Sequence, residues 1–432
     1  MKAFQCLLFF FLSCLQVSAQ DMTYTRQVID TLCSDFMGGR GYSFKGDKKA
    51  ADYLKNEFKK HGLKPFSNGY EQSFLLSANT FPGSMELEVN GIKLAAGKDF
   101  IVRPFSGGQK GVYRAIKFKK KHFLKRSRFF KQISKSQCKN KVLVIDLDDF
   151  ESKEEKEKYE HCLALIKQFD GFELAGLIEV SSSKLTWGVS TNYTGLCVLT
   201  VQKSSWPSNA SEIYFNIEQK FEEIYTSQNV LGYVEGSHFP DSFILFSAHY
   251  DHLGHMGKNI FIAGANDNAS GTSMLLNLAA HYAKPENKPK YSVMFIAFGA
   301  EEAGLIGSKF YVQHPLFPLN RIRFMLNMDL MGTGEDGMTA VNGRVFKKEF
   351  ELLEQLNLKG NYLSKIKKRG KAANSDHYYF SESGVPAFFI YTLGGIQAYH
   401  DIYDISETLP LTKYREVYQL ILDFVNALET PQ

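Results

Sequence analysis

The sequence contains few of the residues and segments that mark several classes of protein. Only 6 cysteines and 2 tryptophans occur in 432 residues. Beyond the N-terminal segment, no apolar run reaches the roughly 20 residues that a membrane-spanning helix needs, so we predict no integral membrane span. The chain has no internal repeat, and its hydrophobic content of 44% argues against disorder. These features predict a globular protein of one large domain or two ordinary ones.

The cysteines are too scattered for a small metal knuckle. Cys33, Cys138, Cys162 and Cys197 lie outside the N-terminal segment, and no two of them form a close pair. Their spacing is compatible with a disulfide among the last three in an oxidising compartment, and equally with buried free thiols.

The positive charge is modest and partly local. The formal net charge is +5, and part of the excess lies in "KFKKKHFLKRSRFFK", residues 117–131. Such a run binds nucleic acid or acidic lipid in some proteins, but it more often forms a solvated loop or helix face. Because no nucleic-acid motif accompanies it, we predict a solvated segment and no nucleic-acid partner.

The N-terminus has the pattern of an export signal. Lys2 precedes the apolar core "FQCLLFFFLSCL", and "VSA" before Gln20 is a small-residue cleavage site. We therefore predict that residues 1–19 are a signal peptide and that the mature chain is periplasmic or extracellular. The alternatives are an uncleaved anchor, and a lipid anchor at Cys14, which ranks second because Phe11 stands where leucine is usual.

Three changes of pattern divide the mature chain. Two segments within residues 22–65 have apolar residues at helical spacing, and Gly62 is placed to end the second helix. Short strand-like runs fill residues 85–220, and from about residue 228 strong apolar strands alternate with amphipathic helices. We predict an α/β domain from residues 20–84 and 221–432, with a three-layer, mostly parallel sheet flanked by helices. Residues 85–220 are then an inserted, smaller, mainly-β domain.

The residues suited to chemistry lie in the last block, where acidic and imidazole side chains follow apolar runs. Ligands collect at strand ends in an open α/β sheet. Five successive segments supply, in chain order, His249 with Asp251, then Asp267, then Glu301 with Glu302, then Asp329, and finally His400.

Each of these segments also has an ordinary explanation. Asp251 can orient a neighbouring loop, and an acidic residue before a helix, such as Asp267, is most often an N-cap. Glu301 and Glu302 are harder to explain in this way. They follow a buried apolar run, and burying an unpaired charge costs several kcal/mol. Chance is a poor account of five successive strand ends that all carry such groups. Two histidines and three carboxylates, with one further Glu, are what two zinc ions require if one carboxylate bridges them.

Five ordered motifs then give a specific resemblance. The segments "HYDHLG", "GANDNASG", "FGAEEAGLIGS", "NMDLMG" and "YHDIYD" resemble metallopeptidase family 28, which contains co-catalytic zinc exopeptidases. The resemblance covers about residues 25–75 and 228–428. The block between them resembles, more loosely, the protease-associated domain often inserted at that point in the family.

The resemblance implies a role for each candidate residue. His249 and Asp329 would hold one zinc ion, Glu302 and His400 the other, and Asp267 would bridge the two. The same resemblance makes Glu301 the general base, Asp251 the residue that orients His249, and Tyr399 a donor to the developing oxyanion. Two further acids, Asp376 and Asp404, would lie around the ligands, whereas His252 and His255 would be loop residues.

The resulting expectation is an exported exopeptidase with two Zn²⁺ per chain, acting on peptides. An aminopeptidase is the first choice. The alternatives are a carboxypeptidase or dipeptidase, a glutaminyl cyclase, which usually binds one zinc, and a catalytically inactive binding ectodomain. Side-chain preference and oligomeric state do not follow from the motifs.

Overall fold

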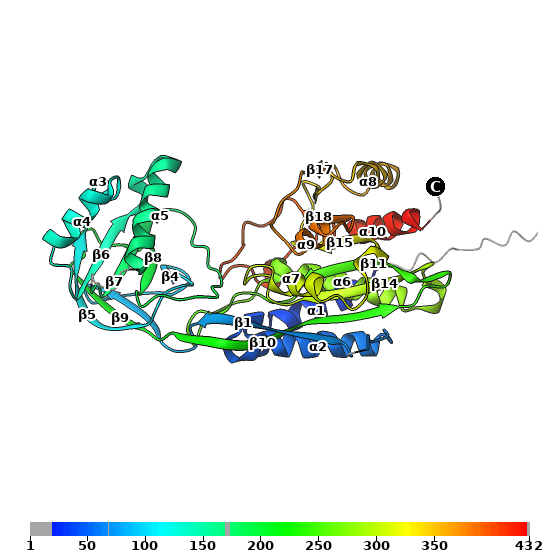
Figure 1. The fold of residues 1–432 in the computed structure, drawn as a ribbon, viewed down its shortest axis with the longest axis horizontal. Coiled ribbons are helices and arrows are strands. Elements are labelled where there is room, and N and C mark those ends of the chain that lie inside the picture. Colours follow the sequence, from blue (N-terminus) through cyan, green and yellow to red (C-terminus); the bar gives the residue numbers. More distant parts are fainter. Residues whose placement is uncertain (1–19, 68, 169–172, 430–432) are drawn as a thin grey trace, which may run out of the picture.

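The computed structural model describes residues 20–67, 69–168 and 173–429. The predicted signal peptide, residues 1–19, lies outside the described residues. Within the described ranges, no helix combines the length and the apolar character that a membrane crossing requires. The chain forms two lobes, each built on an eight-stranded sheet, and long strands connect them (Figure 1).

The larger lobe contains a mixed sheet whose four central strands are parallel. In spatial order its strands are β1 (Glu71–Thr80), β10 (Lys220–Val234), β14 (Tyr291–Phe298), β11 (Phe239–His249), β15 (Ile322–Met328), β18 (Ala387–Thr392), β16 (Met338–Val341) and β17 (Ile366–Lys368). Strands β14, β11, β15 and β18 are parallel, whereas β10 and β16 pair with them in the antiparallel sense. The carboxyl ends of the four central strands therefore meet at one edge of the sheet.

Helices cover both faces of this sheet. One face packs against α1 (Met22–Cys33), α2 (Gly46–Lys60), α6 (Gly271–Tyr282), α8 (Lys347–Gly360) and α10 (Tyr414–Leu428). The other face packs against α7 (Ile306–Gln313) and α9 (His377–Glu382). The predicted three-layer, mostly parallel α/β architecture is confirmed.

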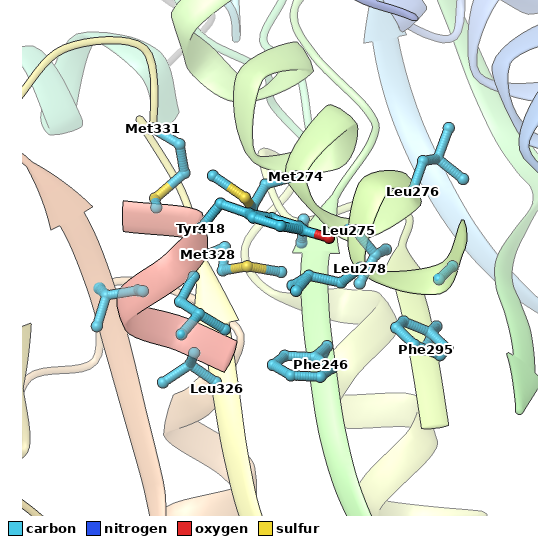
Figure 2. Packing of buried hydrophobic residues seen from close by; sticks show 14 of the residues in the cluster. Phe246, Met274, Leu275, Leu276, Leu278, Phe295, Leu326, Met328, Met331 and Tyr418 are labelled. Carbon is cyan, nitrogen blue, oxygen red and sulfur yellow. The ribbon is translucent and has the colours of Figure 1, made fainter. Parts of the chain in front are cut away.

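The central strands are continuous apolar runs because both of their faces are buried. In β11, Ile244 and Phe246 contact the first helix layer, and Phe243 and Leu245 contact the second. Figure 2 shows Phe246 beneath the leucines of α6 and beside the strand that carries Leu326. This dense packing fixes the positions of the strand ends that carry the polar residues.

The two N-terminal helices follow the predicted pattern. α1 and α2 bury one apolar stripe each, and α2 ends at Lys60. Gly62 lies just beyond it with φ of 75°, a left-handed conformation that favours glycine at a helix end.

The smaller lobe contains a second mixed sheet, formed by strands between residues 85 and 217. Its strands, in spatial order, are β3 (Ile92–Leu94), β2 (Met85–Val89), β9 (Glu212–Ile217), β5 (Gln109–Lys117), β6 (Lys141–Asp146), β7 (Gly176–Ser181), β8 (Val198–Gln202) and β4 (Phe100–Val102). Residues of α3 (Lys120–Phe123), α4 (Arg126–Lys135) and α5 (Lys153–Gln168) pack with one face of it. β1 and β10 flank this block in sequence and join the lobes (Figure 1).

The described cysteines are free thiols in this structure. Cys138, Cys162 and Cys197 are buried, and Cys33 is partly buried. Of the two possibilities compatible with the spacing, the structure has the unpaired one.

Candidate metal centre

Four of the five candidate segments follow central strands of the larger sheet. His249 is the last residue of β11, the two glutamates follow β14, Asp329 follows β15, and His400 lies in the loop after β18. The prediction that all five lie at strand ends is wrong for Asp267. Asp267 lies in the helical turn Ala265–Ser270 that leads into α6, so a helix start brings it to the same edge.

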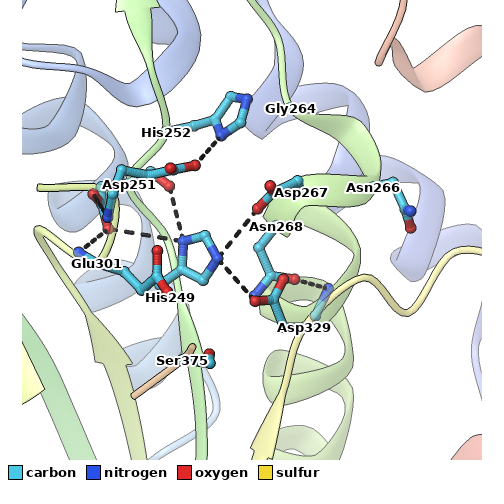
Figure 3. A network of polar contacts seen from close by, with 12 residues as sticks. His249, Asp251, His252, Gly264, Asn266, Asp267, Asn268, Glu301, Asp329 and Ser375 are labelled. Atoms are coloured by element: carbon cyan, nitrogen blue, oxygen red, sulfur yellow. Dashed lines mark hydrogen bonds and ion pairs between the residues drawn. The ribbon is translucent and has the colours of Figure 1, made fainter. Parts of the chain in front are cut away.

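Asp267 lies between the two histidines. Its Oδ1 is 3.2 Å from His249 Nε2, and its Oδ2 is 2.9 Å from His400 Nε2. A second carboxylate approaches each imidazole. Asp329 Oδ2 is 3.4 Å from His249 Nε2, and Glu302 Oε2 is 3.3 Å from His400 Nε2. Figure 3 shows His249 pointing toward Asp267 and Asp329.

The opposite ring nitrogens fix the tautomers of the two histidines. His249 Nδ1 lies 3.1 Å from the backbone oxygen of Asp251, and His400 Nδ1 lies 3.1 Å from the backbone oxygen of Trp187. A carbonyl oxygen can only accept, so each Nδ1 carries the hydrogen. A neutral imidazole then turns the lone pair of Nε2 toward two carboxylates, an arrangement that needs a proton or a metal cation between them.

The donor set fits divalent metal ions. His249, Asp267 and Asp329 form one group whose ligand atoms lie within 4.8 Å of one another, and His252, Asp267, Glu302 and His400 form a second. His249 also forms such a group with Glu301 and Glu302. The first two groups share Asp267. His249 Nε2 and Asp329 Oδ1 are buried without a hydrogen-bond partner among the described residues. Mixed nitrogen and carboxylate oxygen donors suit zinc, and buried carboxylates gathered together need a compensating positive charge.

The electrostatics of the site also favour positive charge. Burial lowers the pKa of His249, but the charges of Asp329 and Glu301 outweigh burial and raise that pKa well above its ordinary value. The same holds for His400. Burial lowers its pKa, but Glu302 and Asp267 outweigh burial and raise the pKa to about 11. The field that holds a proton on these rings also favours a divalent cation.

The two adjacent glutamates are held differently. Burial raises the pKa of Glu302, but the neighbouring histidines outweigh this and lower it to about 2. Burial raises the pKa of Glu301 well above its ordinary value, and the charge of Glu302 adds to that effect. The pKa values of the two adjacent carboxylates are thus shifted in opposite directions, as a metal ligand beside a general base would require.

Asp251 was predicted to orient the His249 ring, but its carboxylate makes its closest contacts with backbone N–H groups. Its carboxylate is 3.8 Å from His249 Nδ1, so the closer orienting contact is the backbone oxygen described above. The same carboxylate accepts the backbone N–H groups of Glu301 and Glu302 at 3.1 and 3.3 Å. Asp251 therefore fixes the turn that presents the two glutamates, as well as the His249 ring.

The sequence interpretation missed His252. It is fully buried, and its Nδ1 lies 2.7 Å from Glu302 Oε1, so it contacts a candidate ligand directly. The available signal was its position, three residues after His249. His255 is a packing residue, as its ring lies against Phe44.

Two further groups support the turn that carries Asp267. Asp404 accepts the backbone N–H groups of Asn266 and Asp267 at 2.8 and 3.0 Å. Arg40 is fully buried, and its guanidinium donates to several carbonyls, including those of Tyr250 and Gly264 at 2.7 and 2.8 Å.

Asp376 is also fully buried, and burial raises its pKa to about 7.

A loop of the smaller lobe holds the loop that carries His400. The backbone N–H of Trp187 donates to the backbone oxygen of His400 at 2.9 Å, and the backbone oxygen of Trp187 accepts the His400 Nδ1–H. Lys184 Nζ lies 2.6 Å from Asp401 Oδ2 and donates to the backbone oxygens of Gln397 and Tyr399. His400 has φ of 53°, a strained backbone conformation that needs such support.

The candidate ligands line a small cavity of about 180 Å³. Tyr399 stacks on the His400 ring with centroids 4.0 Å apart, and its side chain is 42% exposed. The remaining wall consists of Leu330, Arg369, Asn374, Phe389 and Tyr391. A cavity of this size accepts roughly one amino-acid side chain rather than a long peptide segment.

The fold and the buried donor cluster define an α/β protein with a candidate metal centre at the carboxyl edge of its sheet. Residues 229–425 match the family model described as Peptidase family M28. This part of the chain is therefore similar to that family, in agreement with the resemblance of its motifs.

Curated relatives match part of the chain. Aminopeptidase YwaD of Bacillus subtilis is 30% identical over 212 residues, which cover 46% of this chain and 43% of that protein. A probable zinc metalloprotease of Pyrenophora teres f. teres is 34% identical over 146 residues, which cover 31% of this chain and 30% of that protein. The matches span less than half the length of these relatives.

Solved structures match nearly the whole chain in fold. An aminopeptidase from Aneurinibacillus sp. strain AM-1 has a TM-score of 0.64 at 18% identity, covering 96% of this chain and 95% of that chain. BSAP, a zinc aminopeptidase from Bacillus subtilis, has a TM-score of 0.67 at 20% identity, covering 94% and 95%. At these identities the similarity concerns the fold.

Proposed function

We propose that the protein is a zinc-dependent exopeptidase, and specifically an aminopeptidase that removes N-terminal residues from peptides. The observation that carries the proposal is the position of Asp267, whose two oxygens face His249 and His400 separately. This arrangement supports a bridging carboxylate between two cations. The names of the relatives, aminopeptidase and zinc metalloprotease, support the same class of reaction.

Two Zn²⁺ per chain would be held by the two groups that share Asp267. His249 and Asp329 complete one set, and Glu302 and His400 complete the other, as the resemblance of the motifs implies. When bound, the metal ions supply Lewis-acid polarisation of the scissile carbonyl and lower the pKa of a coordinated water. His252 would keep Glu302 oriented through its 2.7 Å contact.

The protein side chains would then move the protons. Glu301, whose pKa is raised by burial and by Glu302, takes a proton from the attacking water and returns it to the leaving amine. Asp251 holds the backbone N–H groups of both glutamates, so it sets the direction of the Glu301 carboxylate. Tyr399 lines the cavity beside His400 and is available to donate to the tetrahedral oxyanion.

The test is a parallel assay of zinc-reconstituted protein on aminoacyl, dipeptidyl and C-terminal peptide substrates, with a chelator-treated control. We expect release of N-terminal residues that the chelator abolishes. Cleavage only from the carboxyl end would replace the proposal with a carboxypeptidase. Cyclisation of N-terminal glutamine by protein with a single zinc would indicate a glutaminyl cyclase. Absence of turnover across the panel, with zinc bound, would indicate a binding ectodomain.

We also propose that the protein is exported, with residues 1–19 as a cleaved signal peptide. The support is the order of a basic residue, an apolar core and a small-residue cleavage site. Sequencing the N-terminus of the mature protein from its native host tests this, and a start near Gln20 is the expected result.

A further inference from the structure

The cavity beside the metal ligands carries a fixed positive charge on its opposite wall. Among the described residues that line it, Arg369 is the one lysine or arginine. It follows β17 directly, and its Nη1 donates to the hydroxyl of Tyr391 at 2.9 Å. Its guanidinium pairs with no carboxylate among the described residues, so a tyrosine hydroxyl is its side-chain partner.

The charges around the cavity do not require Arg369 once metal is bound. The carboxylates that line it belong to Asp267, Glu301, Glu302 and Asp329. Two divalent cations would balance these four negative charges, so Arg369 is not needed to neutralise them. A guanidinium presents a planar fork of N–H donors that matches a carboxylate. Arg369 is exposed at the cavity wall and has no carboxylate partner among the described residues, so it favours a ligand with that group.

The neighbours of Arg369 extend this polar wall. Asn374 adds an amide that can donate and accept, and Tyr391 adds its hydroxyl. Phe389 supplies an apolar surface against which the methylene groups of a side chain can pack. A purely apolar side chain in the cavity would face three polar groups and satisfy none of them, which costs free energy wherever water is displaced.

We propose that Arg369, Asn374 and Tyr391 form a subsite for a substrate carboxylate. The carboxylate comes either from an acidic N-terminal side chain or from the free C-terminus of a dipeptide, because these are the carboxylates that a substrate places within one residue of the scissile bond. The inference rests on the proposed peptidase function and narrows its substrate class. The protein therefore acts on acidic or very short peptides rather than on leucine-like substrates.

The experiment compares Leu-Ala, Gln-Ala and Glu-Ala, each with a free and an amidated C-terminus, as substrates of zinc-loaded protein. The variants are Arg369→Gln, Arg369→Lys, and the matched control Arg344→Gln. Arg344 is a nearby exposed arginine whose backbone N–H donates to the Arg369 oxygen, but its side chain does not line the cavity. Zinc content and melting temperature are measured for every variant.

For the wild-type protein, we expect kcat/KM to be roughly tenfold higher for one substrate of a matched pair. This is the preference that one charge-assisted contact at a partly solvated site provides. The kcat/KM ratio that reports this preference is Glu-Ala-NH₂ over Gln-Ala-NH₂ if the subsite binds the side chain, and Gln-Ala over its amide if it binds the C-terminus. Arg369→Gln should bring the ratio close to one, and Arg369→Lys should retain part of it. Arg344→Gln should leave it unchanged.

Three results would overturn the inference. The ratios could already be near one in the wild-type protein. A second result is that Arg369→Gln leaves the kcat/KM ratios unchanged. A third is that Arg369→Gln slows the hydrolysis of all six substrates equally, which would mean that Arg369 only offsets the negative charge of the carboxylates. Each of these leaves the peptidase function standing. Failure to hydrolyse any of the six substrates, the uncharged Leu-Ala-NH₂ included, would instead remove the proposed function and this inference with it.

Discussion

Replacing Lys184 with methionine should weaken metal binding, although the residue belongs to the smaller lobe and touches no candidate ligand. Its ammonium group holds Asp401 and two backbone oxygens in the loop that carries His400. The Asp401 side chain is only 4% exposed, whereas that of Lys184 is 45% exposed. Lys184→Met leaves this buried carboxylate with the backbone N–H groups of Tyr403 and Tyr399 alone.

The expected magnitude follows from these exposures. A solvent-exposed ion pair contributes about 0.2–1 kcal/mol, whereas leaving a buried polar group short of a partner costs about 1–3 kcal/mol. Because water reaches one side of this pair, we take an intermediate cost of about 1.5 kcal/mol, which corresponds to roughly tenfold in an equilibrium constant. If the fraction of molecules in which the loop holds His400 in its binding position falls tenfold, the zinc affinity of that ligand group falls by the same factor.

The assay is a zinc titration against a chromophoric chelator, with kcat measured on the same samples. The matched control is Lys64→Met, because the Lys64 side chain is similarly exposed but its partner at 2.7 Å, Glu235 on the larger lobe, is exposed as well. We expect about tenfold weaker binding of one zinc ion in Lys184→Met and unchanged binding in the control. Equal zinc affinities in the two variants would refute the idea that the smaller lobe positions His400.

Three other changes test the chemistry and the supports of the site. Glu301→Gln should retain zinc and lose about 10²- to 10⁴-fold in kcat; near-normal turnover would remove Glu301 as the base. Arg40→Met should lower the free energy of unfolding by about 3–5 kcal/mol, because several buried carbonyls lose their hydrogen-bond donor; a loss below about 1 kcal/mol in urea unfolding would contradict that role. Burial raises the pKa of Asp47 to about 6, above the value of about 3.9 in an unfolded chain. The folded protein therefore binds more protons than the unfolded chain between about pH 4 and pH 6, and its stability falls as pH rises through that window, by up to about 3 kcal/mol. Asp47→Asn should remove the contribution of Asp47 to this dependence, and parallel pH profiles of unfolding for the variant and the wild type would count against the argument.

The motifs were sufficient to predict the convergence of residues far apart in the chain. His249, Glu302, Asp329 and His400 all lie beyond strands whose apolar periodicity predicts a parallel sheet, and parallel strands deliver their carboxyl ends to one edge. Asp267 reaches that edge differently. Its turn precedes α6, as the sequence pattern after it predicted, although the residue was also counted among the strand ends.

The contacts that orient the ligands were not predictable from local patterns. His252 contacts Glu302 across 50 positions of sequence, and the Trp187 carbonyl reaches His400 from the other lobe across 213 positions. Such pairings depend on how two packed units meet, which neither helical nor strand periodicity encodes. The same holds for Arg369, whose position in the cavity depends on the pairing of β17 beside β16.

The most direct test of the metal-centre account is a crystal structure of zinc-reconstituted protein, with zinc located by anomalous scattering. The account predicts two zinc ions per chain, one between His249 and Asp329 and one between Glu302 and His400, with Asp267 in contact with both. A fully folded protein that binds no zinc at these residues, or binds it only elsewhere, would contradict it.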